Sequence, residues 1–163
     1  MCFTPSINDP DMENSELLNL EEFLPYRLSV LSNTVSRGIS AAYVDRFGLS
    51  IREWRIIAVL GRYPGLSAAE IVKLTAMDKV AVSRAVTKLT GKGRLKRSLS
   101  AADKRRSVLV LSKEGIRLFD QISPLAKSYE ERLLECLARE DQDKLSDILD
   151  NLQKQARALQ PPD

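Results

Sequence analysis

The chain has 163 residues, a net charge of +3 and 44% hydrophobic residues, which suits one domain with a packed core and argues against disorder. It contains no histidine, so imidazole acid–base chemistry, imidazole metal ligands and a Ser-His-Asp triad are excluded. We therefore predict no catalytic residues, no cofactor and no metal. Only two cysteines occur, Cys2 and Cys136, which favours a reducing cytoplasmic location over a disulfide framework. We expect neither a secretory signal nor a membrane partner, because no suitable apolar run is present.

Positive charge is concentrated in one part of the chain. The segment from Lys79 to Arg106 holds ten basic residues and one acidic residue, Asp103, for a net charge of +9. The flanking segments, 1–78 and 107–163, each carry a net charge of −3. A concentrated cationic patch on an otherwise acidic protein is typical of a protein that binds a polyanion.

The first part of the chain reads as a tail followed by one long helix. Residues 1–15 are polar and contain two prolines, so we expect a flexible tail there. A helix is predicted from about Leu20 to Phe47, because apolar residues recur every three or four positions. Gly48 favours the end of this helix. We expect residues 16–48 to form a dimerisation helix.

The next two helices have the same start signal. Ser50 and Glu53 match a capping box, in which each side chain satisfies a free backbone N–H group of the first turn. This helix should end near the Tyr63-Pro64-Gly65 turn. Ser67 and Glu70 repeat the capping box and start a third, short helix that extends to about residue 74.

A fourth helix is predicted from Asp78, a good N-cap residue, to about Thr90. Its apolar residues fall on one face, which leaves mostly polar and basic side chains on the other: Lys79, Ser83, Arg84, Thr87 and Lys88. An outward face of hydrogen-bond donors with Arg84 at its centre suits base edges and phosphates. For one helix alone, an ordinary solvated face would be the simpler interpretation. The preceding capped helix and the basic segment that follows favour nucleic-acid recognition.

A β-hairpin follows, with one strand around Leu95 and Leu99, a polar loop at residues 100–104 and a second strand at residues 107–111. The loop and its flank carry four charged residues: Asp103, Lys104, Arg105 and Arg106. A helix-turn-helix with such a hairpin is a winged helix-turn-helix, which we predict for residues 49–112. The fold class is therefore mainly α with a small β-hairpin wing, plus N- and C-terminal dimerisation helices.

Two amphipathic helices complete the chain. The first begins at Ser112 or Lys113, extends to about Arg139 and contains Pro124, which should bend it. The last runs from about Asp141 to Leu159. The winged domain does not need these apolar stripes for its own core, so residues 113–163 are predicted to pair with a second copy of the chain. A two-fold dimer would place its recognition helices one DNA turn, ~34 Å, apart on a near-palindromic operator.

These residues resemble the MarR family of bacterial transcriptional regulators over roughly residues 20–159. The resemblance rests on LSIREWRIIAVLGRYPGLSAAEI, MDKVAVSRAVTKLTGKGRLKR and AADKRRSVLVLSKEG, which follow the family's order of helices, D-x-R wing and Ser-x-x-Gly helix start. By this resemblance Arg105 reaches into the minor groove, Asp103 holds the wing's shape and Arg106 contacts a phosphate. The family also implies a homodimer, double-stranded DNA as partner, and a pocket for phenolic or aromatic acids or their coenzyme A thioesters. A bound ligand would lower the affinity for DNA.

Several residues are candidates for that ligand pocket: Tyr26, Arg27, Ser29, Ser32, Asn33 and Trp54. Arg27 would receive a ligand carboxylate, although an ordinary salt bridge is the simpler role. The serines and Asn33 would either donate hydrogen bonds to a ligand or form a close helix–helix seam, and Trp54 suits core packing as well as a pocket wall. Cys136 is expected to be a buried structural cysteine rather than a redox sensor.

The leading hypothesis is a repressor released from DNA by a small molecule. The alternative is a dimeric helical adaptor whose basic wing binds an acidic protein or a membrane surface, which would not need the donors at positions 83, 84 and 87. An enzyme is not expected, since no phosphate loop, carboxylate pair or nucleophile–base arrangement is visible.

Overall fold

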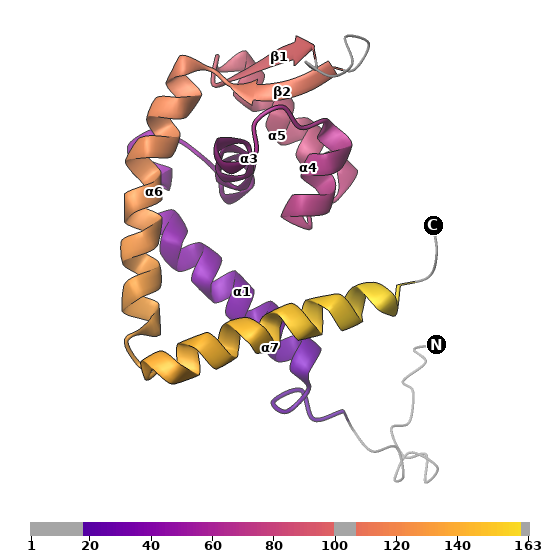
Figure 1. Cartoon of the computed structure of the whole chain (residues 1–163). Helices are drawn as coiled ribbons and strands as arrows, with labels where there is room; N and C mark the ends of the chain where they lie inside the picture. The colour runs from indigo at the N-terminus through magenta and orange to yellow at the C-terminus, as the bar shows by residue number, and fades with distance from the viewer. Residues whose placement is uncertain (1–17, 100–106, 161–163) are drawn as a thin grey trace, which may run out of the picture. The chain divides into compact units, whose positions relative to one another are not determined.

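The structure, a computed structural model, describes residues 18–99 and 107–160. Within these ranges the chain forms seven helices and one antiparallel hairpin, as the predicted fold class requires (Figure 1). The tail expected at residues 1–15 and four wing residues lie outside the described residues: Asp103, Lys104, Arg105 and Arg106. The chain divides into two compact units, residues 1–36 and residues 37–163.

The long N-terminal helix predicted for Leu20 to Phe47 is wrong in its bounds, because two helices stand there. Helix α1 spans Leu24–Ala41 and helix α2 spans Val44–Phe47. Tyr43, between them, leaves helical geometry with φ −131° and is 1% exposed. The break between α1 and α2 lets the Tyr43 ring join the apolar core of the second unit. Burial of this ring stabilises the fold more than an uninterrupted helix would.

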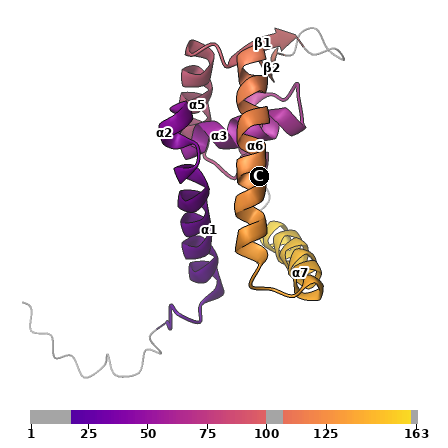
Figure 2. The same cartoon turned by 90° about the vertical axis from the view of Figure 1, so that its left-hand side faces the viewer.

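The core of the second unit surrounds α3, which spans Ile51–Arg62 and contacts three further helices (Figure 2). These are α4 (Ala68–Thr75), α5 (Lys79–Gly91) and α6 (Lys113–Leu134). Their fully buried apolar side chains come from every one of these helices: Ile56, Ile57, Leu60, Ile71, Val82, Leu89 and Ile122. Both predicted capping boxes and the predicted N-cap of α5 are present, so local signals position the starts of α3, α4 and α5.

The hairpin forms at the predicted place. Strand β1 (Leu95–Leu99) pairs antiparallel with β2 (Ser107–Leu111), with Leu95 opposite Leu111. The backbone N–H of Leu109 donates a hydrogen bond of 2.8 Å to the carbonyl oxygen of Leu66, which ties the loop before α4 to the hairpin. The hairpin is thus fixed to the helices at its base.

The helix expected from Ser112 to about Arg139 ends earlier than predicted. Helix α6 ends at Leu134, and α7 begins at Arg139 and runs to Ala158. The amide of Gln142 donates hydrogen bonds of 3.2 Å to the carbonyl oxygens of Leu134 and Leu137, in the turn between the two helices. Pro124 lies inside α6 as expected.

Candidate nucleic-acid interface

The recognition face of α5 is open to solvent. All five residues predicted for it are exposed: Lys79, Ser83, Arg84, Thr87 and Lys88. The opposite face, which includes Val82 and Leu89, is buried in the core. Helix α5 therefore holds its donors away from the protein, as contact with a DNA groove requires.

The turn between α4 and α5 fixes how α5 begins. Ala76 adopts a left-handed backbone conformation, with φ 51°, which ends α4 and reverses the chain within a few residues. Asp78 then accepts a hydrogen bond of 2.7 Å from the backbone N–H of Ala81. Two short helices joined by this turn form the helix-turn-helix unit.

A hollow of about 280 Å³ lies on one side of α5, against α4 and β1. Its polar and charged rim consists of Lys79, Ser83 and Thr87 from α5 and Arg97 from β1. Arg97 was not among the predicted site residues, although it belongs to the cationic segment. Arg97 reaches this hollow only because the hairpin lies beside α5 in the folded chain.

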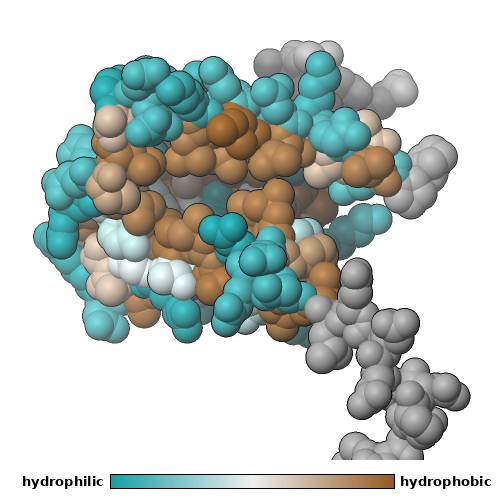
Figure 3. All heavy atoms as spheres, turned by 90° about the horizontal axis from the view of Figure 1, so that it is seen from below, coloured by the Kyte–Doolittle hydropathy of each residue, from teal (hydrophilic) through white to brown (hydrophobic). Residues whose placement is uncertain are grey.

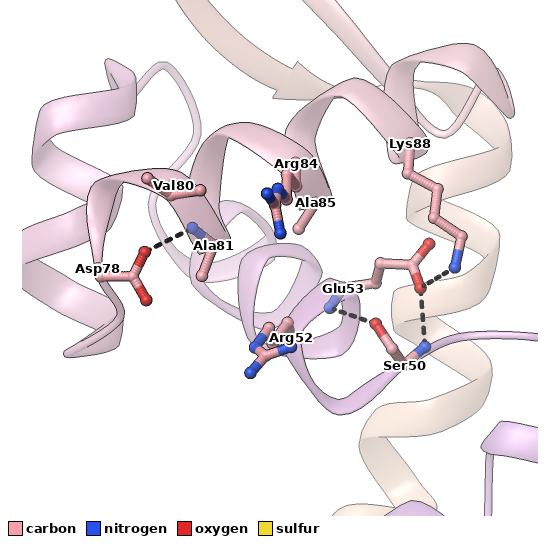
Figure 4. A pocket seen from close by; sticks show the side chains of 9 residues that line it. All are labelled: Ser50, Arg52, Glu53, Asp78, Val80, Ala81, Arg84, Ala85 and Lys88. Atoms are coloured by element: carbon pink, nitrogen blue, oxygen red, sulfur yellow. Dashed lines mark hydrogen bonds and ion pairs between the residues drawn. The ribbon is translucent and has the colours of Figure 1, made fainter.

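A second hollow, of about 260 Å³, lies on the other side of α5, against the first turn of α3 (Figure 4). Arg84 and Lys88 reach it from α5, and Arg52 reaches it from α3. Val80 also lines this hollow and is 58% exposed, so an apolar side chain stands among the donors of the recognition face. Neither Arg52 nor Val80 was predicted from the sequence. Val80 could have been noticed, because it is an apolar residue that lies outside the buried stripe of α5.

Lys88 is tied to the protein by a buried carboxylate. Its ammonium donates to Oε2 of Glu53 at 3.1 Å, and the Glu53 side chain is 1% exposed. Burial alone raises the pKa of Glu53, but hydrogen bonds from the backbone and side chain of Ser50, together with Lys88, hold that pKa below its usual value. Glu53 is therefore ionised at neutral pH and links α3 to the recognition helix.

The end of α5 is fixed to α2 by two cations. Lys92 donates to the carbonyl oxygen of Gly48 at 3.1 Å, and Arg94 donates to that of Phe47 at 2.9 Å. These carbonyls stand at the C-terminal end of a helix, where the helix dipole favours positive charge. The two contacts orient the segment that joins α5 to the wing.

The residues predicted for a ligand pocket are divided between the two units. Tyr26 and Arg27 line a hollow of about 350 Å³ along the start of α1. Ser29, Ser32 and Asn33 are exposed on α1 and do not line that hollow. Trp54 belongs to the second unit.

The ring of Trp54 lies between two other aromatic rings. Its centroid is 5.7 Å from that of Tyr43 and 6.3 Å from that of Phe119. Burial raises the pKa of Tyr43 to about 12, although the positive charge of Arg55 opposes the shift, so this phenol stays neutral. Trp54 packs as the core interpretation requires; its role toward a ligand stays a prediction.

Cys136 is exposed, so the expectation of a buried structural cysteine is wrong. It lies beyond Glu135, the C-cap of α6, so the helical pattern that placed it among leucines does not extend to it. Within residues 18–99 and 107–160, no cluster of potential metal ligands occurs. No described helix is long and apolar enough to span a membrane.

Comparison with known proteins decides the family. The sequence model of the MarR family matches residues 47–106. A solved MarR/EmrR family transcriptional regulator from Acinetobacter sp. ADP1 is 30% identical, with a TM-score of 0.81 over 87% of this chain and 100% of that chain. The chain belongs to the MarR family. It is therefore a DNA-binding transcriptional regulator and not an enzyme.

Two further relatives agree with membership of the MarR family. A MarR family regulator from Silicibacter pomeroyi is 26% identical, with a TM-score of 0.76 over 84% of this chain and 91% of that chain. The HTH-type transcriptional regulator BilQ of Clostridium symbiosum is 27% identical over 115 residues, which cover 71% of this chain and 80% of that protein. The predicted family, the winged-helix fold and the absence of enzymatic function are thus confirmed.

Proposed function

We propose that this MarR-family protein is a homodimeric repressor that leaves a near-palindromic operator when a small aromatic or phenolic acid, or its coenzyme A thioester, binds. The observation that carries the proposal is the exposed donor face of α5 within the cationic segment from Lys79 to Arg106. Acting on DNA, the protein would work in the cytoplasm.

The DNA-binding part of the proposal divides the work between the helix and the wing. The residues of the α5 face lie in the major groove, where side-chain donors distinguish base pairs. Three wing residues take the roles that the family resemblance implies: Arg105 enters the minor groove, Asp103 shapes the wing, and Arg106 contacts a phosphate. Lys104 belongs to the same DNA-binding set. The net charge of +9 in this segment favours rapid, salt-sensitive association with DNA.

The dimer part of the proposal is supported by apolar side chains that a single chain leaves in water. Helix α7 has no buried residue, yet it exposes four large apolar side chains: Leu145, Ile148, Leu149 and Leu152. The first unit exposes more of them, including Leu24, Leu28 and Leu31. Figure 3 shows apolar side chains gathered on the face that it draws. Extensive apolar surface of this kind favours self-association, and a two-fold pairing of identical faces is its simplest form.

The effector part of the proposal is supported by proteins with the same fold. NadR has been solved with 4-hydroxyphenylacetate (22% identical, TM-score 0.67) and CouR from Rhodococcus jostii with p-coumaroyl-CoA (19% identical, TM-score 0.73). BpsR of Bordetella bronchiseptica is regulated by 6-hydroxynicotinic acid (19% identical, TM-score 0.70). In this chain Arg27 supplies a cation for an acid group, and Tyr26 beside it supplies an aromatic wall.

To test the proposal, the purified protein is mixed with labelled DNA that flanks its own gene, in the presence of excess random competitor DNA. Fluorescence anisotropy measures the binding. A panel of aromatic acids and their coenzyme A thioesters is then added to the complex. The proposal predicts competitor-resistant binding that one compound of the panel abolishes. Competitor-resistant binding that every compound leaves intact would contradict the effector class, and binding that random DNA removes would contradict operator recognition.

A further inference from the structure

The hollow between α3 and α5 contains two arginines with no partner in the described part of the chain. Arg52 lies in the first turn of α3, and Arg84 lies on the outward face of α5, 32 positions later in the sequence. Both side chains are exposed and line the hollow, Arg52 from α3 and Arg84 from α5 (Figure 4). Within residues 18–99 and 107–160, neither makes a hydrogen bond or an ion pair.

Two carboxylates also line this hollow, and each accepts at least one hydrogen bond, although Oε1 of Glu53 has no hydrogen-bond partner. Glu53 accepts hydrogen bonds from the backbone N–H of Ser50 at 2.8 Å and from Lys88 at 3.1 Å. Asp78 caps α5 through Ala81 at 2.7 Å, at the far end of the hollow from Lys88 (Figure 4). The two guanidinium groups are therefore the free charged donors of the hollow.

Three cationic side chains, those of Arg52, Arg84 and Lys88, line the hollow against two carboxylates, so its lining carries a net positive charge that favours an anion. A guanidinium presents its N–H groups as a planar fork, which matches the oxygens of a phosphate in two parallel hydrogen bonds. The hollow has room for such a group, at about 260 Å³.

The position of the hollow identifies the source of the phosphate. It borders the recognition face of α5, and the sugar–phosphate backbone borders any helix that lies in the major groove. A phosphate of the bound DNA would therefore meet Arg84 from one wall and Arg52 from the other.

We propose that Arg52 and Arg84 together hold one backbone phosphate of the operator in the hollow between α3 and α5. This inference rests on the proposed operator binding. It makes Arg84 a contact to the DNA backbone and leaves base recognition to other residues of the α5 face. It also adds α3, which precedes the helix-turn-helix, to the DNA interface.

The experiment compares four variants of the full-length protein: Arg52→Gln, Arg84→Gln, the double variant, and Arg62→Gln as a matched control. Arg62 lies at the opposite end of α3, is exposed and loses the same charge on substitution. Affinities for operator and random DNA are measured by anisotropy between about 50 and about 200 mM KCl. Thermal melting and gel filtration verify that each variant folds and assembles like the wild type.

One phosphate contact contributes about 0.9 to the slope of log K against log salt concentration. The double variant should therefore lose about 0.9 of slope, and its affinity should change about 3.5-fold less than that of the wild type over a fourfold salt range. Because one phosphate serves both arginines, the two single effects should not add. Operator and random DNA should be weakened by the same factor, and Arg62→Gln should leave both unchanged.

Three results would overturn the inference. In the first, the double variant binds both DNAs with the same affinity and salt slope as Arg62→Gln. In the second, Arg84→Gln lowers the affinity for the operator but not for random DNA. In the third, the slope losses of the two single variants add to about 1.8 in the double variant. Inorganic phosphate, added at constant ionic strength, should compete weakly and equally with both DNAs in the wild type and less in the double variant. Failure of the proposed function is distinguishable, because the wild type itself would then show no preference for the operator.

Discussion

Replacing Gly115 with alanine should destabilise the winged domain, although glycine is normally the weaker helix former. Gly115 lies in the first turn of α6 and is buried against the segment that leads into β1. A methyl carbon at this position would overlap the carbonyl oxygen of Arg94 and lie 3.3 Å from the Cβ of Leu111. Backbone cannot rotate away as a side chain can, so α6 and the hairpin would have to separate.

The size of the effect follows from what that separation disturbs. The Arg94 carbonyl accepts the backbone N–H of Ser112 at 3.0 Å, and the Ser112 hydroxyl donates to Gly93 at 2.6 Å. Overpacking costs about 1–3 kcal/mol, and a weakened hydrogen bond costs about 0.5–1.5 kcal/mol. Alanine has the higher helix propensity, which stabilises the variant by about 1 kcal/mol relative to glycine. We therefore expect a net loss of about 0.5–3.5 kcal/mol in the free energy of unfolding.

The assay is urea unfolding followed by circular dichroism at a fixed protein concentration, because a dimer's stability depends on concentration. Gly91→Ala is the matched control. Gly91 is the last residue of α5, and a methyl group there meets nothing within 4 Å, so this variant should gain up to about 1 kcal/mol. The steric reasoning would be refuted if Gly115→Ala were as stable as the wild type or if both variants were stabilised alike.

Three further predictions concern charge and assembly. Glu53→Gln should make the free energy of unfolding less sensitive to acid. Because the pKa of Glu53 is lowered in the folded protein, its contribution to stability is complete above the ordinary glutamate pKa of ~4.3 and is lost as the pH falls through the lowered value. Between these two pH values, stability should therefore fall more steeply with decreasing pH in the wild type than in the variant. Arg105→Ala should weaken operator binding at least tenfold, or about 1.4 kcal/mol, in an anisotropy titration while gel filtration still shows a dimer; unchanged affinity would refute the wing role. Ile148→Glu on α7 should raise the dimer dissociation constant more than tenfold, measured by sedimentation, and an unchanged constant would exclude this face from the dimer interface.

Local signals made much of the fold predictable from the sequence. Ser50 and Glu53, or Ser67 and Glu70, are three residues apart, so the capping boxes that start α3 and α4 depend on no distant contact. The buried face of α5 followed from helical periodicity alone. The exposed donors on the opposite face of α5 followed from the same pattern.

Long-range packing set the features that the sequence did not reveal. The break before α2 exists because Tyr43 enters a core built from later helices. Lys88 and Glu53 are 35 residues apart, and their ion pair forms only when α3 and α5 pack together. Arg52 joins Arg84 for the same reason, so no periodicity within either helix could have indicated their shared hollow.

Hydroxyl-radical footprinting on the DNA that flanks the protein's own gene would show whether a dimer binds a specific operator there. We expect two protected patches on one face of the duplex, with centres about 10 base pairs apart and related by two-fold symmetry. The patches should disappear when the releasing compound is added. Uniform protection at all positions, or none beyond that seen on random DNA, would contradict sequence-specific binding by a dimer.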